Sequence, residues 1–254
     1  MAELLHIGAH RLESSWEGDP APRALVLLHE GLGSVGLWRD FPRKLAGASA
    51  LPVFAYSRPN YGRSSASAPL PRPVRYMHDE ALLLPEVLRA AGIREPVLFG
   101  HSDGASIALL HAAAQPVRGL VLEAPHVFAE EAGLQSIERA GQAFLTTDLP
   151  QKLAKYHGKN VEGAFWGWNR AWLDPGFRSW NLESYLPHIL IPTLVVQGEN
   201  DEFGTIKQVE AVQRQLGGEV ELVLLTGCGH SPHRDRPKEV LAAMRRFVTT
   251  RLRE

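Results

Sequence analysis

The chain has little of what marks a secreted or membrane-spanning protein. Its 254 residues contain one cysteine, Cys228, which has no partner for a disulfide within the chain. No apolar run approaches the roughly 18 residues that a membrane-spanning helix needs. The first residues, 1–6, lack the basic and long apolar segments of a secretory signal peptide. These absences predict a protein of the reducing cytoplasm.

An excess of charge of either sign is also lacking. The chain has 27 Lys and Arg residues against 28 Asp and Glu residues, so its formal net charge is −1. Without a positive field there is no general attraction for phosphate backbones or anionic lipids. We therefore expect neither nucleic acid nor a membrane as a partner. The sequence does not specify an oligomeric state. Hydrophobic residues make up 44% of the chain, which is enough for a sizeable core.

Short apolar segments recur along the chain and are typical of strands covered on both faces. They lie at residues 24–28, 52–56, 96–99, 119–122, 192–196 and 220–225. The segments between them are typical of helices and lie at residues 78–91, 105–114, 205–216 and 238–251. This alternation predicts an α/β fold, with a mostly parallel sheet and helices on both of its faces. Residues 4–16 predict an antiparallel strand pair at one edge.

One long tryptophan-rich interval interrupts the alternation. The predicted core comprises residues 1–124 and 187–254, and the insertion comprises residues 125–186 with helices at 130–144 and 149–156. Four of the six tryptophans lie within the fifteen residues 166–180. The aromatic residues of the insertion either form its own apolar core or wall an apolar pocket. They are Phe165, Trp166, Trp168, Trp172, Phe177 and Trp180.

A serine between two glycines follows the predicted strand at 96–99. Residues 100–104 read G-x-S-x-G with Ser102 at the centre, and a helical segment follows directly. In so sharp a turn, side chains at positions 100 and 104 would collide with the crossing backbone, and the serine hydroxyl is presented outward. The N–H groups at the start of the helix favour negative charge beside it. We interpret Ser102 as a nucleophile.

A serine hydroxyl needs a base and an orienting acid before it can attack. Asp201 follows the strand at 192–196 and His230 follows the strand at 220–225, so both belong at the same edge of the sheet as Ser102. We predict that His230 takes the Ser102 proton while Asp201 holds the histidine tautomer. Competing carboxylates are those of Glu199, Glu202 and Glu123, which could all be solvated loop groups; Glu123 also ends a strand and is kept as the alternative acid.

A negatively charged tetrahedral intermediate needs at least two N–H donors. The first is expected from the backbone of Asp103, the residue after the nucleophile. The second is expected from the glycine-punctuated turn at residues 29–34, either from Gly31 or from Leu32.

The spacing of Cys228, His230 and His233 suggests a metal site as an alternative interpretation. Their spacing does not match the usual zinc patterns, and a fourth ligand is lacking nearby. We therefore expect no metal and no cofactor. We expect Cys228 to be buried as a small hydrophobic residue and His233 to have a structural role near the helix that follows it.

Taken together, these motifs resemble the α/β-hydrolase fold superfamily over nearly the whole chain. The resemblance rests on residues 29–34, on the loop at residues 58–64, on the turn around Ser102, on residues 198–201 and on the Gly229–His230 pair. It implies an eight-stranded α/β-hydrolase sheet and a serine hydrolase in which residues 125–186 form a helical cap over the active site. The chain looks most similar to bacterial esterases, enol-lactonases and carbon–carbon hydrolases of ring-cleavage products.

Two positions depart from the pattern that the resemblance implies. Many members have His-Gly at the oxyanion turn, whereas this chain has His29-Glu30, which puts a carboxylate beside a site that must stabilise negative charge. Glu30 either points away into a salt bridge or points into the pocket and binds a donor group. The second departure is Asp103, where the carbon–carbon hydrolases usually carry an apolar residue.

We therefore expect cleavage of a small carboxylic ester, lactone or thioester through an acyl-enzyme on Ser102. The alternatives are carbon–carbon bond hydrolysis and, more remotely, non-catalytic binding on a hydrolase scaffold. The expected partner is a small molecule with an apolar or aromatic acyl group. The residues expected to contact it are Trp166, Trp168, His29 and Glu30, with at least one of the two tryptophans in contact.

Overall fold

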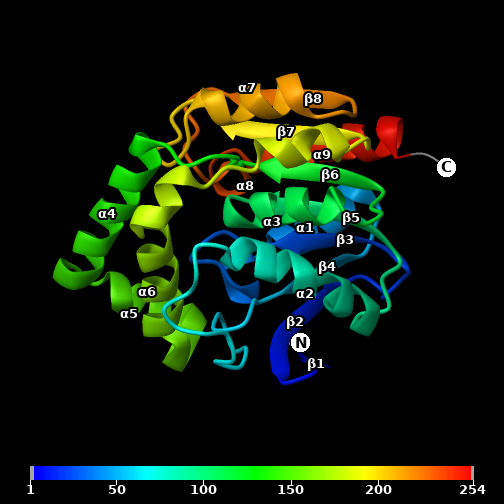
Figure 1. The fold of residues 1–254 in the computed structure, drawn as a ribbon. Helices are drawn as coiled ribbons and strands as arrows, with labels where there is room; N and C mark the ends of the chain where they lie inside the picture. The colour runs from blue at the N-terminus through cyan, green and yellow to red at the C-terminus, as the bar shows by residue number, and fades with distance from the viewer. Residues whose placement is uncertain (1–2, 253–254) are drawn as a thin grey trace.

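A computed structural model describes residues 3–252, which form a sheet of eight strands with helices on both faces (Figure 1). The strands are β1 (Glu3–Ile7), β2 (His10–Glu17), β3 (Arg23–Leu28), β4 (Val53–Tyr56), β5 (Glu95–His101), β6 (Gly119–Glu123), β7 (Thr193–Gly198) and β8 (Val220–Leu225). Their order across the sheet is β1-β2-β4-β3-β5-β6-β7-β8. From β4 to β8 neighbouring strands are parallel, while β1 and β2 pair antiparallel at one edge. The predicted fold class is confirmed.

Two layers of helices explain why the central strands are almost wholly apolar. One face is covered by α2 (Tyr76–Ala90), α3 (Asp103–Ala112) and α7 (Ile206–Gln215), and the other by α1 (Phe41–Ser49) and α9 (Pro237–Arg251). Each layer has its own apolar cluster, because alternate residues of a strand point to opposite faces. Val26 and Leu28 of β3 therefore belong to the first cluster, and Leu25 and Leu27 to the second.

A helical insertion (residues 124–192) separates β6 from β7. It contains α4 (Glu131–Thr146), α5 (Leu149–His157), η2 (Gly158–Asn160), α6 (Val161–Trp172), η3 (Pro175–Ser179) and η4 (Glu183–His188). Figure 1 shows α4, α5 and α6 grouped beside the carboxyl ends of the parallel strands. The short elements η1 (Val35–Trp38) and α8 (Pro232–Asp235) also lie in loops that follow strands, after β3 and β8. Functional side chains that follow strands therefore face this insertion.

The aromatic residues of the insertion do not form a separate core. Phe165, Trp168, Trp172, Phe177 and Trp180 belong to the same apolar cluster as the sheet residues Val26 and Leu28. Helix α6 carries three of the tryptophans. The sequence pattern does not predict this helix. Gly163 and Gly167 weaken its helical signal, but at Gly167 a larger residue would press against Leu70 and Arg72 of the loop after β4. Tertiary packing, which local propensity does not record, stabilises this helix.

Helices that could cross a bilayer are not found among residues 3–252.

Candidate active site

Ser102 sits at the junction of β5 and α3 in a strained backbone conformation. Its φ of 54° and ψ of −118° lie outside the regions that non-glycine residues commonly adopt. A Cβ at Gly100 would overlap the backbone of Gly104, and one at Gly104 would overlap the backbone of Leu28. The predicted steric reason for both glycines is therefore visible. The Ser102 N–H donates to the Glu123 carbonyl at 2.9 Å, which fixes the turn to the neighbouring strand.

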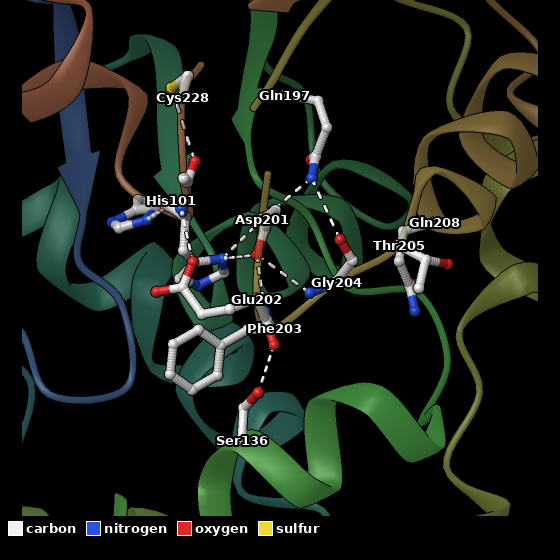
Figure 2. Close-up of polar contacts among 12 residues, drawn as sticks. His101, Ser136, Gln197, Asp201, Glu202, Phe203, Gly204, Thr205, Gln208 and Cys228 are labelled. Carbon is white, nitrogen blue, oxygen red and sulfur yellow. Dashed lines mark hydrogen bonds and ion pairs between the residues drawn. The ribbon is translucent and has the colours of Figure 1, made fainter. Parts of the chain in front are cut away.

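His230 and Asp201 form a hydrogen-bonded pair on the loops after β8 and β7. The His230 Nδ1–H lies 2.8 Å from both carboxylate oxygens of Asp201. Asp201 also accepts from the N–H groups of Phe203 at 2.8 Å and Gly204 at 3.1 Å, and from the Gln197 amide at 2.9 Å (Figure 2). Since Nδ1 is occupied as a donor, the Nε2 atom of neutral His230 is left as an acceptor.

The electrostatics of this pair favour the charged form of both groups. Burial alone would raise the pKa of Asp201, but the charge and hydrogen bond of His230 and the N–H of Phe203 outweigh it and hold this pKa below its usual value. Burial alone would lower the pKa of His230, but Asp201 outweighs it and raises this pKa above 6.5. The arrangement stabilises an imidazolium at position 230.

The other carboxylates considered as the acid lie elsewhere. Glu123 accepts from the ring Nδ1 of His233 at 2.8 Å and also from the His233 backbone N–H. Glu199 is exposed on its loop. Glu202 contacts the backbone of His230, whose N–H lies 3.3 Å from its carboxylate, and not the ring. Of the four candidates, Asp201 is the one hydrogen-bonded to the His230 ring.

A group of metal-ligand type lies behind the nucleophile turn and consists of His101, Glu123 and His233, whose ligand atoms lie within 4.8 Å of one another. All three are buried, and several of their polar atoms already serve the fold: Glu123 accepts from His233, and the His101 Nε2–H donates to the His230 carbonyl at 2.7 Å. The Cys228, His230 and His233 set considered from sequence is split, because the two histidines bind different carboxylates. Cys228 is buried, as expected of a small hydrophobe.

The turn after β3 is held so that one peptide group faces the cavity. The Glu30 carbonyl accepts from the His29 ring Nδ1 at 2.7 Å, from an Arg58 Nη2 at 2.8 Å and from the Gly33 N–H at 3.0 Å. Because C=O and N–H point in opposite directions across a trans peptide, the Gly31 N–H points away from these donors. Gly31 itself lines the cavity that contains Ser102. This orientation favours Gly31 over Leu32 as an oxyanion donor.

The other expected donor, the backbone N–H of Asp103, is at the first residue of α3 and so has no acceptor within the helix. The Asp103 side chain is fully buried and ties three elements together. It accepts from the Tyr76 hydroxyl and, at 3.2 Å, from the indole N–H of Trp172, and an Arg58 nitrogen lies 3.8 Å away. Burial, only partly offset by Arg58, raises the pKa of this carboxyl. Asp103, which stands where the carbon–carbon hydrolases usually carry an apolar residue, is thus a buried group that holds the helical insertion in place.

A cavity of about 170 Å³ opens over Ser102 and His230. Its lining comes from the oxyanion turn, the nucleophile turn, the insertion and the loops after β6, β7 and β8. The lining residues are Glu30, Gly31, Leu32, Ser102, Asp103, His126, Ile137, Trp168, Trp172, Glu202, Phe203, His230 and Ser231. The structure therefore brings Ser102, His230, Asp103, Gly31 and Leu32 together, with Asp201 behind His230.

Two of the four residues expected to contact substrate line this cavity, Trp168 and Glu30. The Trp168 indole packs so closely on Gly31 that a Cβ there would overlap it. Trp166 and His29 differ from expectation. Trp166 lies on the outer side of α6, where its indole N–H donates to Glu162 at 2.9 Å and Arg170 lies 5.1 Å from its ring.

Trp166 and Trp168 differ because the helical period turns side chains two positions apart to opposite sides. His29 is buried beneath the turn, where its Nε2 accepts from the Arg58 N–H at 3.1 Å, so its ring holds the loop instead of facing the cavity.

His126 and Phe203 line the cavity but were missed from sequence. The ring of His126 lies 5.6 Å from that of His230, and the Phe203 ring lies 4.8 Å from it. Burial, together with the charge of His230, lowers the pKa of His126 to about 3, so His126 is neutral at physiological pH. Both residues follow strands, β6 and β7, and that position was the signal that could have identified them.

Comparison with known proteins identifies the family and the fold. Residues 25–243 match the model of the alpha/beta hydrolase family. MGS-M2, an alpha/beta hydrolase enzyme from a Medee basin deep-sea metagenome library, superposes with a TM-score of 0.79 at 19% identity over 98% of each chain. Est816, described as an N-acyl homoserine lactone degrading enzyme, gives 0.72 at 22% identity over 96% of this chain and 100% of its own.

Proline iminopeptidase from Mycobacterium smegmatis gives a TM-score of 0.71 at 18% identity, over 99% of this chain and 98% of its own. Similarity at these identities shows the fold and does not identify the bond that this chain cleaves. The family match spans most of the chain and includes both the nucleophile turn and the histidine loop. The chain belongs to the alpha/beta hydrolase family, and it is a hydrolase.

Proposed function

We propose that this protein cleaves a small carboxylic ester, lactone or thioester through an acyl-enzyme on Ser102. The observation that carries the proposal is the Asp201–His230 pair at 2.8 Å in the same cavity as the strained Ser102 turn. A binding protein has no need of a strained serine beside an oriented histidine, whereas a nucleophile needs both.

The reaction follows from these positions. His230 Nε2 takes the proton of the Ser102 hydroxyl as its oxygen attacks the substrate carbonyl carbon, and Asp201 stabilises the imidazolium that forms. The N–H groups of Gly31 and Asp103 donate hydrogen bonds to the oxyanion. The imidazolium then protonates the leaving alcohol or thiol. A water molecule, deprotonated by His230, attacks the acyl-enzyme and releases the acid.

The dimensions and lining of the cavity support a small substrate. About 170 Å³ is enclosed by Leu32, Ile137, Trp168, Trp172 and Phe203 on its apolar sides. The last four come from the helical insertion and the loop after β7, so the proposed cap of residues 125–186 would supply most of the wall that contacts an apolar or aromatic acyl group.

Carbon–carbon hydrolysis of a ring-cleavage product ranks below ester cleavage. Such a substrate is an acid, and the residues described around the cavity include Glu30 and Glu202 but no lysine or arginine to bind its carboxylate.

Purified protein should be assayed with p-nitrophenyl esters of increasing acyl length beside a ring-cleavage chromophore. We expect a burst of nitrophenol, turnover of the short esters and labelling by a fluorophosphonate that disappears in Ser102→Ala. Turnover of the chromophore alone would favour carbon–carbon hydrolysis. If the protein neither turns over any of these substrates nor is labelled, the proposed acyl-enzyme mechanism is wrong.

A further inference from the structure

We infer that the preferred substrate carries an ammonium group close to the scissile carbonyl and that Glu30 binds it. This inference rests on the proposed function, since it specifies which esters the same cavity prefers. Glu30 directly precedes Gly31, the expected oxyanion donor, and both line the cavity with Ser102. In a space of about 170 Å³, a ligand that reaches Ser102 also lies near Glu30.

The carboxylate of Glu30 lies against Gly33 within its own turn, and Glu30 is one of the residues that line the cavity. A Cβ on Gly33 would overlap an oxygen of Glu30, so glycine at position 33 leaves the room that this carboxylate occupies. The Glu30 backbone carbonyl is held by His29, Arg58 and the Gly33 N–H. Glu30 lines the cavity and is in none of the ion pairs described for residues 3–252, so of the two orientations considered from sequence, a salt bridge elsewhere or the pocket, we infer the second.

The negative charge of Glu30 has no cation paired with it among the described residues. The ion pairs of residues 3–252 do not include it, and the one hydrogen bond described for its carboxylate comes from its own backbone N–H. Arg58 donates to the Glu30 carbonyl at 2.8 Å, but the ion pair described for it is with the Asp103 carboxylate, at 3.8 Å. Burial raises the pKa of Glu30, against the smaller effects of His233 and Arg58. The carboxylate therefore lies where a bound cation would stabilise it.

The remaining lining of the cavity suits a cation as well. Three aromatic rings, those of Trp168, Trp172 and Phe203, face the space, and aromatic faces attract ammonium groups. Glu202 adds a second carboxylate, and His126 is neutral. An acyl or alcohol group with negative charge would meet no compensating lysine or arginine among the described lining residues.

A bound ammonium also resolves the conflict between Glu30 and the oxyanion. An unneutralised carboxylate beside the oxyanion donors opposes the charge that develops on the substrate oxygen. An ammonium held between Glu30 and that oxygen would reverse this effect, most strongly as the oxyanion forms. The preference should therefore appear in kcat/KM and not only in binding.

The test uses two pairs of esters that differ in charge but little in shape. Leucine methyl ester is compared with methyl 4-methylpentanoate, which places the ammonium in the acyl group. Butyrylcholine is compared with 3,3-dimethylbutyl butyrate, which places it in the alcohol. Acid release is followed at pH 7 for the wild type, for Glu30→Gln and for Glu199→Gln, a matched control because Glu199 is an exposed carboxylate of the loop that carries Asp201.

We expect the wild type to favour the charged ester of at least one pair by roughly tenfold or more, as one good ion pair provides. In Glu30→Gln this ratio should fall to about one, and in Glu199→Gln it should stay at the wild-type value. The pair that shows the ratio identifies the side of the ester that carries the ammonium. A wild-type ratio near or below one in both pairs, or a ratio that survives in Glu30→Gln, overturns the inference while ester hydrolysis stands.

A binding measurement keeps the inference testable if no ester is cleaved, which would be a failure of the proposed function itself. Benzyltrimethylammonium is titrated into Ser102→Ala and into Ser102→Ala with Glu30→Gln, and quenching of tryptophan fluorescence reports occupancy beside Trp168 and Trp172. Saturable quenching that weakens roughly tenfold without Glu30 supports the cation site. Absence of saturable quenching, or equal affinity in both proteins, overturns it.

Discussion

Glu123 and His233 form a buried hydrogen-bonded pair, with 2.8 Å between the carboxylate and ring Nδ1, that repeats the geometry of Asp201 and His230 one strand away. Glu123 ends β6 and Asp201 follows β7, and both histidines lie between β8 and α9. Only His230 lines the cavity. The two pairs therefore have separate tasks: one orients a base, and the other anchors the loop that carries it.

Substitution of the two carboxylates should separate these tasks. Asp201→Asn should lower kcat by about 10⁴-fold, because an amide at this position holds the wrong histidine tautomer. Glu123→Gln should act mainly on stability, since it weakens a buried bond to His233 that does not touch the cavity. Steady-state kinetics and thermal melts of both variants check this. A mild Asp201→Asn beside a severe loss of kcat in Glu123→Gln would show that the acid is Glu123.

The nucleophile and the base should act as one unit. Ser102→Ala and His230→Ala are each expected to reduce ester turnover by several orders of magnitude, roughly 10⁴-fold or more. The double variant should lose little beyond either single variant, because each alone already abolishes the attack. Turnover of an ester and fluorophosphonate labelling are measured for all three proteins. More than a tenth of wild-type activity in Ser102→Ala would eliminate the acyl-enzyme mechanism.

The pH dependence should report the ionisation of His230. This group must be neutral to accept the Ser102 proton, so kcat/KM should rise with pH and then level off. Because Asp201 raises the pKa of His230, the midpoint should lie above the ordinary value of 6.5. In Asp201→Asn any residual activity should show a lower midpoint. His126, with a pKa of about 3, contributes nothing in this range. A profile that stays flat down to about pH 5 would exclude histidine as the base.

The ionised carboxylate of Glu30 should lower the stability of the folded protein at neutral pH. Its pKa is raised in the fold above the ordinary 4.5, so the folded state binds a proton more tightly than the unfolded chain does. Stability is therefore lost as pH rises from below 4.5 through the folded pKa. Glu30→Gln should raise Tm at pH 8, and the gain should shrink toward zero below about pH 4.5. An equal change of Tm at both pH values would show that the carboxylate charge is not the cause.

The tryptophans of α6 should respond differently according to the side of the helix. Trp168→Ala removes a buried ring that walls the cavity, so it should change the preference among acyl groups and cost about 3 to 5 kcal/mol of stability. Trp166→Ala should leave acyl preference unchanged, because its ring faces the outer surface with Arg170. Thermal melts and kcat/KM over a series of acyl lengths compare the two. Altered selectivity in Trp166→Ala alone would contradict the placement of both rings.

Short-range features of the sequence were sufficient for the fold class and for Ser102, Asp201 and His230 as candidates. The nucleophile turn depends on steric limits at Gly100 and Gly104, which act over a few residues and leave a local signature. The alternation of apolar strands with helices specifies a parallel sheet, and a parallel sheet brings the ends of β5, β7 and β8 to one edge. The composition of a short segment therefore located each of the three residues.

Only the tertiary structure decided how side chains from distant segments pair. Two histidines and several carboxylates lie near the same edge, and the path of each loop assigns His230 to Asp201 and His233 to Glu123. The outward position of Trp166 and the inward position of Trp168 depend on a helix that packs on the oxyanion turn.

The conformation of the turn that carries Glu30 likewise depends on Gly33, His29 and Arg58, and Arg58 lies 28 residues away along the chain. Local propensity carries no information about such partners, because their energies exist only once the segments have met.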